Sequence, residues 1–331
     1  MLLAGDIGGT KTRLALLTIE AGPRQPVVEA TFPSREYPNL EAVVATFLAG
    51  TSYAVDSACF GVAGPVVDGR ASVTNLPWKM DVKTLSRNLG FPKVYLINDL
   101  EAIATAIPFL EPADLHTLNS GKPAHGGAIG VIAPGTGLGE GFLTWDAAAN
   151  RYRAQPSEGG HASFAPQTTL ELELLRYLQS QFGHVSCERV CSGQGLRNIY
   201  AFMKASGHSA EPGWLAERLA SAEDPNPIVV AAALDPDRPC EICTQTLALF
   251  VSILGAEAGN LALKVLATGG IYLAGGIPPR IRPALDAGFM EAFCHKGRLR
   301  DLLLAIPVHI VTNPDTALFG AGCYLLENAP A

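Results

Sequence analysis

The chain has 331 residues, of which 48% are hydrophobic, so it can bury a substantial core in two domains or in one large one. Its 24 lysines and arginines against 31 aspartates and glutamates give a formal net charge of -7, which disfavours a nucleic-acid-binding protein. Seven scattered cysteines do not form the dense framework of a small secreted domain, and an odd number cannot all pair internally. We therefore expect reduced thiols and a cytoplasmic protein.

Two features of the sequence bear on export and membranes. The chain enters a strand pattern at Leu2 without a basic stretch, an apolar segment and a cleavage site, so no export signal is expected. The most apolar region, Leu247–Ile277, is interrupted by Glu257, Asn260 and Lys264 and predicts a buried helix followed by a strand. No membrane partner is expected.

The first seventeen residues predict a β-hairpin with functional residues at its bend. Strand patterns at 2–4 and 13–17 flank the loop Asp6-Ile7-Gly8-Gly9-Thr10-Lys11. The small residues let backbone N–H groups approach a phosphate, and the loop adds a hydroxyl, a cation and a carboxylate, a set that suits polyphosphate and hydrated Mg²⁺. The spacing is not that of a Walker A loop, and a glycine bend in a hairpin can also be purely structural.

Residues 128–145 repeat this layout. A strand pattern at 128–133 leads into Pro134-Gly135-Thr136-Gly137-Leu138-Gly139, and another strand follows at 142–145. The repeat predicts two similar lobes, with two loops that clamp the phosphates of a nucleotide. The spacing does not match the Rossmann fingerprint, which disfavours a dinucleotide enzyme. A third pair, Gly275-Gly276, permits flat contact with a ring such as adenine or serves only as a tight strand exit.

Strands that alternate with helices imply an α/β fold. Helices are expected at 40–48, 82–89, 170–182, 188–204, 214–221, 228–234, 247–266 and 316–326, and strands at 57–62, 94–97 and 271–274. Prolines near 108–112 and at 314 predict a smaller α/β domain of residues 1–108 plus 314–331 and a larger one of residues 109–313. The last helix is expected to return to the smaller domain.

Asn98 and Asp99 follow the strand at 94–97, where an α/β sheet meets its ligands. A carboxylate in this position can accept the proton of a sugar hydroxyl that attacks phosphorus. The structural alternative makes Asp99 the N-cap of a helix at 101–106.

The loop Glu158-Gly159-Gly160-His161 places an acceptor and a donor where they could grip vicinal sugar hydroxyls, and Glu188, before a helix, offers another acceptor. The alternatives are a packed or surface histidine and an ordinary charge in a first helical turn.

Metal sites have weaker support in the sequence. A zinc cluster of His161, His184, Cys187 and Cys191 matches no standard spacing. The single C-x-x-C motif at 240–243 lacks the second ligand pair of a structural zinc site.

Taken in order, these segments resemble the bacterial ATP-dependent glucokinase family. The motifs that carry the resemblance span nearly the whole chain: Asp6-Ile7-Gly8-Gly9-Thr10, Gly61-Val62-Ala63-Gly64-Pro65, Thr74-Asn75 with Trp78, Asn98-Asp99, Gly135-Thr136-Gly137-Leu138-Gly139, Glu158-Gly159-Gly160-His161, Glu188-Arg189-Val190 and Ala274-Gly275-Gly276. The resemblance implies a two-lobed ribonuclease H-like (actin-like ATPase/hexokinase) fold with the ligand cleft between the lobes. It also implies transfer of the γ-phosphate of ATP to the 6-hydroxyl of glucose, a step of glycolysis.

The same resemblance implies roles for individual residues. Asp99 is expected to be the catalytic base, and Asp6 to hold Mg²⁺ through water. The sugar is expected to contact Asn75, Asn98, Asp99, Glu158, His161 and Glu188. The nucleotide is expected to contact Asp6, Gly8, Gly9, Thr10, Lys11, Gly135, Thr136 and Gly137 through its phosphates and Gly275 and Gly276 through its adenosine. ATP and Mg²⁺ are the expected cofactors, and a homodimer is the expected assembly.

The sequence departs from the family at Lys11-Thr12, where Asn-Ala is more usual. A lysine there is similar to the related repressor and sugar-kinase group, which typically carries a cysteine-rich zinc motif soon after its Glu-Gly-His segment. The stretch after His161 has no such motif, so the zinc-free glucokinase branch is favoured.

Other interpretations stay open. A kinase for mannose, glucosamine or N-acetyl sugars would keep the same mechanism, because no motif reports the direction of one hydroxyl. A sugar-sensing repressor would need a helix-turn-helix, for which a phosphate loop at residue 6 leaves no room upstream. A sugar-binding or actin-like protein that hydrolyses ATP slowly would need Asp99 only as a helix cap. Polyphosphate and ADP are alternative phosphoryl donors.

Overall fold

The computed structural model describes residues 1–73 and 76–328, which form two compact units. Unit 1 comprises Met1–Glu111, Tyr152–Ala154 and the C-terminal segment from Asn313 onward. Unit 2 comprises Pro112–Arg151 and Gln155–Thr312. Asn75, which was predicted to contact the sugar, lies outside the described residues.

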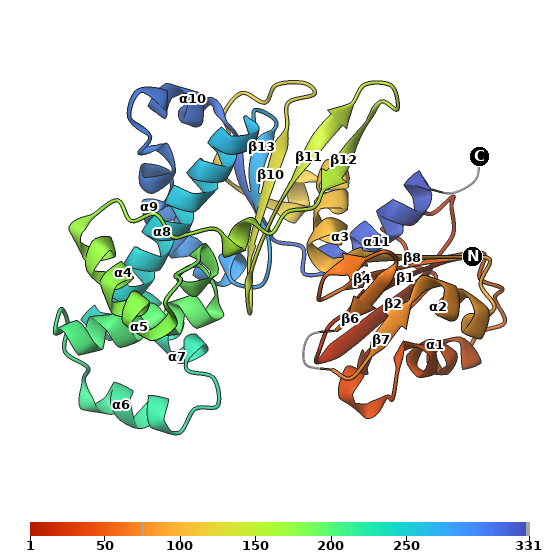
Figure 1. Ribbon diagram of the computed structural model, residues 1–331, viewed down its shortest axis with the longest axis horizontal. Helices are drawn as coiled ribbons and strands as arrows, with labels where there is room; N and C mark the ends of the chain where they lie inside the picture. Colours follow the sequence, from red (N-terminus) through yellow and green to blue (C-terminus); the bar gives the residue numbers. More distant parts are fainter. Residues whose placement is uncertain (74–75, 329–331) are drawn as a thin grey trace. The chain divides into compact units, whose positions relative to one another are not determined.

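Unit 1 is built on a five-stranded sheet in the order β3-β2-β1-β4-β8 (Figure 1). The strands are β1 (Leu2–Ile7), β2 (Lys11–Leu17), β3 (Val28–Pro33), β4 (Ser57–Val62) and β8 (Lys93–Asn98). The β1–β2 hairpin is antiparallel, as predicted, whereas β1, β4 and β8 run parallel with Ile7, Val62 and Asn98 in register. The residues that follow these three strands therefore share one edge of the sheet.

The two faces of this sheet are covered by different helices because side chains alternate along each strand. Leu3 and Ile7 of β1 pack on the face that also buries α1 (Leu40–Ala49) and α2 (Val82–Leu89). Leu2 and Ala4 pack on the opposite face with α3 (Asp99–Ala106) and α11 (Thr316–Glu327). The helices predicted at 40–48, 82–89 and 316–326 are confirmed to within one residue at each end.

Short elements complete unit 1. They are the antiparallel strands β5 (Val66–Val67), β6 (Arg70–Ser72) and β7 (Lys79–Asp81) and the 3₁₀ turns η1 (Ser34–Glu36) and η2 (Ile107–Phe109). The sequence patterns gave no signal for β3 or for these strands, which are short or half-exposed and are defined by their pairing partners.

Unit 2 is built on a six-stranded sheet in the order β12-β11-β10-β13-β14-β9 (Figure 1). The strands are β9 (Leu115–Asn119), β10 (Ile129–Pro134), β11 (Leu138–Asp146), β12 (Arg151–Gln155), β13 (Gly270–Leu273) and β14 (Val308–Val311). The β10–β11 hairpin is antiparallel and β10 pairs in parallel with β13, as β1 pairs with β4 in unit 1. The predicted similarity of the two hairpins is thus confirmed at the level of strand pairing.

Helices make up most of the remainder of unit 2. They are α4 (Thr169–Phe182), α5 (Gly193–Ser206), α6 (Gly213–Ala220), α7 (Asn226–Leu234), α8 (Glu241–Val265), α9 (Arg282–Cys294) and α10 (Arg300–Ala305). The 3₁₀ turns are η3 (Pro112–Asp114), η4 (Gly159–His161), η5 (Cys187–Arg189), η6 (Pro278–Ile281) and η7 (Gly297–Leu299).

The central helix α8 explains the most apolar stretch of the sequence. Within the described part of the chain, it is the one helix with the length and apolarity to cross a membrane, yet most of it is buried inside unit 2. It packs against α5, α7 and α9 and against strand β10 (Figure 1). It begins at Glu241, six residues before the predicted start, because buried Ile242 and Cys243 extend its apolar face toward the N-terminus.

One predicted helix is wrong at its start. The stretch predicted as a helix from Glu188 is divided into η5 and α5, and α5 begins only at Gly193. The side chain of Ser192 caps α5 by accepting a hydrogen bond from the backbone N–H of Gly195 at 3.1 Å, which fixes the helix start there. Glu188 is therefore not a first-turn charge of a long helix but part of a short turn.

Candidate active site

The loop between β1 and β2 is held by hydrogen bonds from its own bend and from η1. The Gly8 N–H donates to the Lys11 carbonyl at 3.0 Å. The Ser34 hydroxyl donates to the Gly8 carbonyl at 2.8 Å, and the Ser34 N–H donates to the Thr10 carbonyl at 3.0 Å. Thr10 and Lys11 remain exposed. The loop is thus a fixed turn that presents a hydroxyl and a cation to solvent.

The carboxyl groups of unit 1 gather near this loop. The pKa of Asp6 is raised to about 6, by burial first and then by the charge of Asp99. The Arg13 guanidinium opposes this rise, and the charge of Asp315 adds to it. Arg13 pairs with Asp315 at the start of α11 and with Glu29 of β3, the latter at 2.6 Å. The predicted residues Asp6 and Asp99 are therefore near neighbours, and Asp315 joins them.

Asp99 is the first residue of α3 and not its N-cap. The cap is Asn98, whose Oδ1 accepts a hydrogen bond from the Leu100 N–H at 2.9 Å, while its amide donates to the Gly64 carbonyl at 3.0 Å. Asp99 Oδ1 also accepts from the Leu100 N–H at 2.9 Å. Burial raises the pKa of Asp99, and these hydrogen bonds oppose that rise. The interpretation of Asp99 as the N-cap is wrong, and its carboxylate lies where β8 ends.

This group of carboxylates suits a hydrated cation. Desolvation and mutual repulsion of Asp6 and Asp99 both favour a nearby positive charge. Across residues 1–73 and 76–328, no three His, Cys, Asp or Glu side chains converge closely enough to hold a metal directly. Mg²⁺ commonly keeps several waters and uses only one or two carboxylates. The carboxylates of Asp6 and Asp99 therefore fit Mg²⁺ held through water. The zinc cluster considered from the sequence, His161, His184, Cys187 and Cys191, is not assembled within residues 1–73 and 76–328.

Asp315 and Arg13 were missed in the sequence. Arg13 lies in a strand and Asp315 more than three hundred positions later, so their pairing follows only from the return of α11 to the β1–β2 hairpin. The loop Asn313-Pro314-Asp315-Thr316 before an apolar helix was the available signal.

The second glycine loop lies in unit 2 and is tied to two other segments. The Gly135 carbonyl accepts a hydrogen bond from the Gly193 N–H at the start of α5, at 2.8 Å. Glu188 Oε2 accepts from the Leu138 N–H at 3.1 Å, and a Cβ at position 137 would lie 2.5 Å from that oxygen. A side chain at position 137 would displace the Glu188 carboxylate from the Leu138 N–H, so the loop and Glu188 form one assembly.

A cavity of about 880 Å³ opens beside this loop within unit 2. Three predicted residues line it, Gly135, Thr136 and Gly276, and Gly275 lies next to it with a positive φ of 82°. A Cβ at Gly275 would come within 2.7 Å of the Pro134 carbonyl oxygen, so glycine alone fits there. The strand ends of β10 and β13 thus form one wall of the cavity.

The remaining walls come from α5, α7 and η6 and were not predicted. They include Gln194, Arg197, Asn226 and Arg280. The Oδ1 atom of Asn226 is buried and has no hydrogen-bond partner among the described residues. An orphaned acceptor on the wall of a cavity suits a ligand that carries an N–H donor.

The predicted sugar loop lies on β11. Gly159 and Gly160 pack tightly against that strand, where a Cβ at either position would overlap Glu140 or the Leu138 carbonyl. The loop leaves the side chains of Glu158 and His161 exposed, with 3.9 Å between Glu158 Oε2 and His161 Nε2. The two turns η4 and η5 are joined by a hydrogen bond from the Cys187 N–H to the Ala162 carbonyl at 2.9 Å. Unit 2 therefore brings Glu158, His161 and Glu188 into neighbouring turns.

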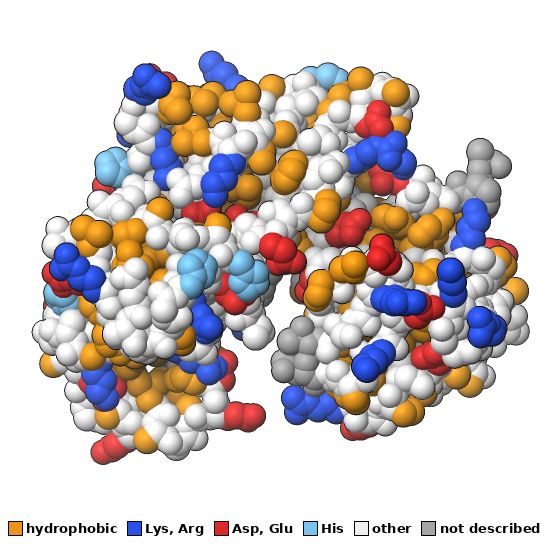
Figure 2. Space-filling view, viewed as in Figure 1, with side chains coloured by type: hydrophobic (Ala, Val, Ile, Leu, Met, Phe, Trp, Pro, Cys, Tyr) orange, Lys and Arg blue, Asp and Glu red, His pale blue; other side chains and the backbone are white. Residues whose placement is uncertain are grey.

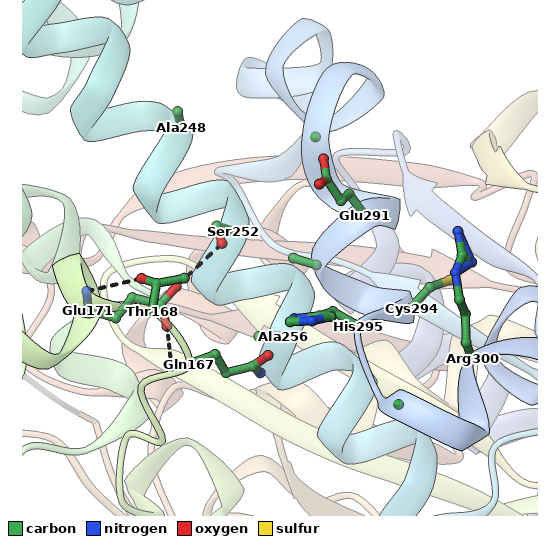
Figure 3. A pocket seen from close by; sticks show the side chains of 13 residues that line it. Gln167, Thr168, Glu171, Ala248, Ser252, Ala256, Glu291, Cys294, His295 and Arg300 are labelled. Atoms are coloured by element: carbon green, nitrogen blue, oxygen red, sulfur yellow. Dashed lines mark hydrogen bonds between the residues drawn. The ribbon is translucent and has the colours of Figure 1, made fainter.

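A second cavity of unit 2, of about 650 Å³, lies between α4, α8 and α9 (Figure 3). Buried Glu171 lies on its wall and accepts hydrogen bonds from the Gln167 N–H at 2.6 Å and the Ser252 hydroxyl at 3.4 Å. None of its lining residues belongs to the set predicted from the sequence.

Basic and acidic side chains are mixed over the face drawn in Figure 2, without a continuous basic area among the described residues there.

Comparison with known proteins identifies the family. A family model described as "Glucokinase" matches residues 3–328. The chain is 43% identical to the glucokinase of Nostoc punctiforme, with 97% of each chain covered, and 38% identical to that of Psychromonas ingrahamii, with 98% and 97% covered.

Solved structures agree with this match. The crystal structure of a glucokinase from an Antarctic psychrotroph superposes with a TM-score of 0.83 at 32% identity over 99% of both chains. A ROK family glucokinase from Streptomyces griseus, in complex with glucose and AMPPNP, shares the fold at a TM-score of 0.63 and 19% identity, with 97% of both chains covered. The predicted α/β fold of the actin-like ATPase and hexokinase type is confirmed, and the chain belongs to the glucokinase family.

Proposed function

We propose that this ATP-dependent hexose kinase transfers the γ-phosphate of ATP to the 6-hydroxyl of glucose, giving glucose 6-phosphate and ADP. The observation that carries the proposal is the position of Asp99, a half-buried carboxylate at the carboxyl end of β8, with Asp6 beside it. Relatives named glucokinase, at 38–43% identity over nearly the whole chain, support glucose as the acceptor.

Asp99 acts as the general base in this proposal. Its carboxylate accepts the proton of the 6-hydroxyl while that oxygen attacks the γ-phosphorus in line. The Leu100 N–H and the first turn of α3 hold the carboxylate in one orientation. A base of this kind typically contributes about 10²–10⁴-fold to the rate.

The proposed sugar contacts are taken unit by unit. They are Asn98 and Asp99 in unit 1, with Asn75 as a further predicted contact, and Glu158, His161 and Glu188 in unit 2. Acceptors and donors built for hydroxyls discriminate strongly against a sugar that lacks one, because the protein group then stays unpaired.

The cavity of about 880 Å³ in unit 2 is the proposed nucleotide site. The proposed phosphate contacts are Gly135, Thr136 and Gly137 in unit 2 and Gly8, Gly9, Thr10 and Lys11 in unit 1. Gly275 and Gly276 would lie flat against the adenosine. The unpartnered Oδ1 of Asn226 is available to accept a hydrogen bond from the amino group of the base. The AMPPNP bound to the Streptomyces griseus enzyme supports ATP as the donor.

Asp6 would hold Mg²⁺ through water, and the ion would supply positive charge to the phosphate oxygens during transfer. Arg13 keeps Asp6 available as an anion, because the guanidinium opposes the rise in its pKa that burial and the neighbouring carboxylates cause.

The cellular setting follows from the same activity. We propose a cytoplasmic homodimer that acts at the entry of glucose into glycolysis. The seven cysteines, all free and buried, are compatible with a reducing compartment.

The experiment that tests the function measures ADP release from MgATP. Glucose, mannose, glucosamine, N-acetylglucosamine, fructose and no sugar are compared. We expect turnover that depends on sugar and is fastest with glucose. Equal ADP release with and without sugar would contradict a sugar kinase, and a higher kcat/KM for an amino sugar would reassign the acceptor.

A further inference from the structure

Two buried carboxyl groups lie beneath the turns that carry the proposed sugar ligands. Glu140 of β11 is 2% exposed and Glu257 of α8 is 5% exposed. Glu257 has partners: the Asn260 amide donates to its Oε2 at 2.9 Å, and Lys264 Nζ lies 3.4 Å from its Oε1. The Oε1 of Glu140 is buried with no partner among the described residues. A buried polar atom of this kind is costly, so its retention calls for a reason.

Glu140 supports the η4 turn directly. A Cβ at Gly159 would overlap Oε2 of Glu140, so the loop backbone lies against this carboxyl group. Glu158 and His161 flank that contact point on the two sides of the turn.

The same carboxyl pair underlies η5. Cys187, adjacent to Glu188, has a raised pKa because of burial first and then the charges of Glu257 and Glu140. The Cys187 N–H joins η5 to the residue after η4 through the Ala162 carbonyl. A displacement of Glu140 would therefore reach both turns.

The surroundings favour a proton on Glu140. Burial and the charge of Glu257 raise the pKa of Glu140 to about 7, against the opposing charge of Lys264. Glu257 pairs with Lys264 and with the Asn260 amide, whereas Oε1 of Glu140 has no partner among the described residues to stabilise a negative charge. The titratable and charged groups around this cluster are Glu257 and Lys264 of α8, Cys187 and Cys191, Glu171 of α4, Lys296 after α9, and Glu158 and His161 of the η4 loop.

We propose that Glu140 is a positioning residue for the sugar site: protonated, it supports the turns that present Glu158, His161 and Glu188, and its ionisation weakens the binding of glucose. A second negative charge beside Glu257 and under Gly159 repels its neighbour and draws water toward the turns. The proposal rests on the proposed function, because glucose is its ligand.

The proposal predicts a pH profile for the KM of glucose. If only the protonated form binds the sugar, KM is constant below about pH 6 and rises about tenfold by pH 8. The kcat at saturating glucose does not follow this rise, because Glu140 does not touch the reacting atoms.

The decisive comparison uses Glu140→Gln and Glu140→Met, two neutral side chains of similar length. Either variant should keep the KM that the wild type shows at pH 6 and lose its rise at higher pH. The surface substitution Glu217→Gln, at an exposed position of α6, serves as the matched control and should keep the wild-type profile. A rise that persists unchanged in a folded Glu140 variant would overturn the proposal.

A measurement on the wild type keeps the proposal testable if both variants fail to fold. Calorimetric titration with glucose at pH 8, in buffers of different ionisation enthalpy, should report uptake of nearly one proton per sugar bound. Binding without proton uptake would overturn the role of Glu140 and leave the kinase assignment intact. Absence of both glucose binding and sugar-dependent turnover at every pH would instead contradict the proposed function itself.

Discussion

Asp6 is held in surroundings that oppose its ionisation. Its pKa is raised from 3.8 to about 6, first by burial and then by the charge of Asp99. In the unfolded chain the group titrates near its ordinary value, so the folded state binds the proton more tightly. The contribution of Asp6 to stability is therefore fully present below about pH 4 and is lost as the pH rises through about 6.

Because the stability contribution of Asp6 falls as the pH rises, it gives a prediction for Asp6→Asn in the absence of nucleotide and metal. The amide cannot ionise, so the variant should gain stability relative to the wild type as the pH rises from 4.5 to 7.5. The gain should reach about 1–2 kcal/mol, less than the full shift implies because the side chain keeps some solvent contact. Urea denaturation at both pH values measures it, and a difference that is independent of pH would contradict the assigned pKa.

Single residues were predictable where a local pattern marks them. Asp99 follows a strand pattern, and the loop at 135–139 contains more glycine than a hairpin needs, so the sequence alone marks both as candidate site residues. Glu140, Asn226 and Asp315 were not, because their significance comes from partners far along the chain. Glu140 gains its proposed role from its contact with Gly159 and from the charge of Glu257, and Asp315 gains its role from Arg13.

Among the elements, α3 and α11 pack unusually closely. A Cβ at Gly320 of α11 would overlap the Ala102 carbonyl of α3, a backbone atom that cannot move aside. Since Asp99 begins α3 and Asp315 precedes α11, this contact also fixes the distance between two groups of the candidate site.

Gly320→Ala should therefore lower the free energy of unfolding by about 2–4 kcal/mol, through overpacking against backbone. Gly50→Ala is the matched control, because no atom lies within 4 Å of a Cβ there and its φ of -86° suits alanine. The control should change stability by no more than about 0.5–1 kcal/mol. Chemical denaturation of both variants decides the matter, and equal effects would contradict close α3–α11 packing.

Elements with a clear apolar pattern were predicted with nearly correct bounds, as the amphipathic helix α2 and the wholly buried strand β4 show. The failures have physical causes. The sequence around Glu188 is compatible with a helix, but the Ser192 cap starts α5 later. Helix α9 gave a usable signal that was missed, since Pro283 occupies an early helical position where proline is favoured. Strands β9, β12 and β14 are short, and pairing within the sheet of unit 2 defines them.

At the scale of the whole molecule, the two units have the same strand-pairing pattern around their hairpins, as the repeated sequence layout predicted. Each has an antiparallel hairpin whose first strand also pairs in parallel with a later strand. The apolar residues of the chain form separate hydrophobic cores in the two units, and α8 contributes many residues to the core of unit 2.

All seven cysteines are buried in these cores, with Cys59 and Cys323 in unit 1 and the others in unit 2. Burial raises the pKa of Cys323 to about 12 and that of Cys59 well above its usual value, so both are poor nucleophiles. A thiol-specific reagent should react slowly with the native protein and with all seven thiols after unfolding. Rapid reaction of several thiols in the native protein would contradict the packing of both cores.

The central claim is that Asp99 is the base of a sugar-dependent phosphoryl transfer, and steady-state kinetics of Asp99→Asn test it most directly. Asp68→Asn, on an exposed turn whose φ of 51° suits asparagine, is the control and should retain activity. We predict that kcat for glucose-dependent ADP formation falls about 10²–10⁴-fold in Asp99→Asn, with little change in the KM for ATP. A variant that retains the wild-type kcat would contradict the assignment of Asp99 as the catalytic base.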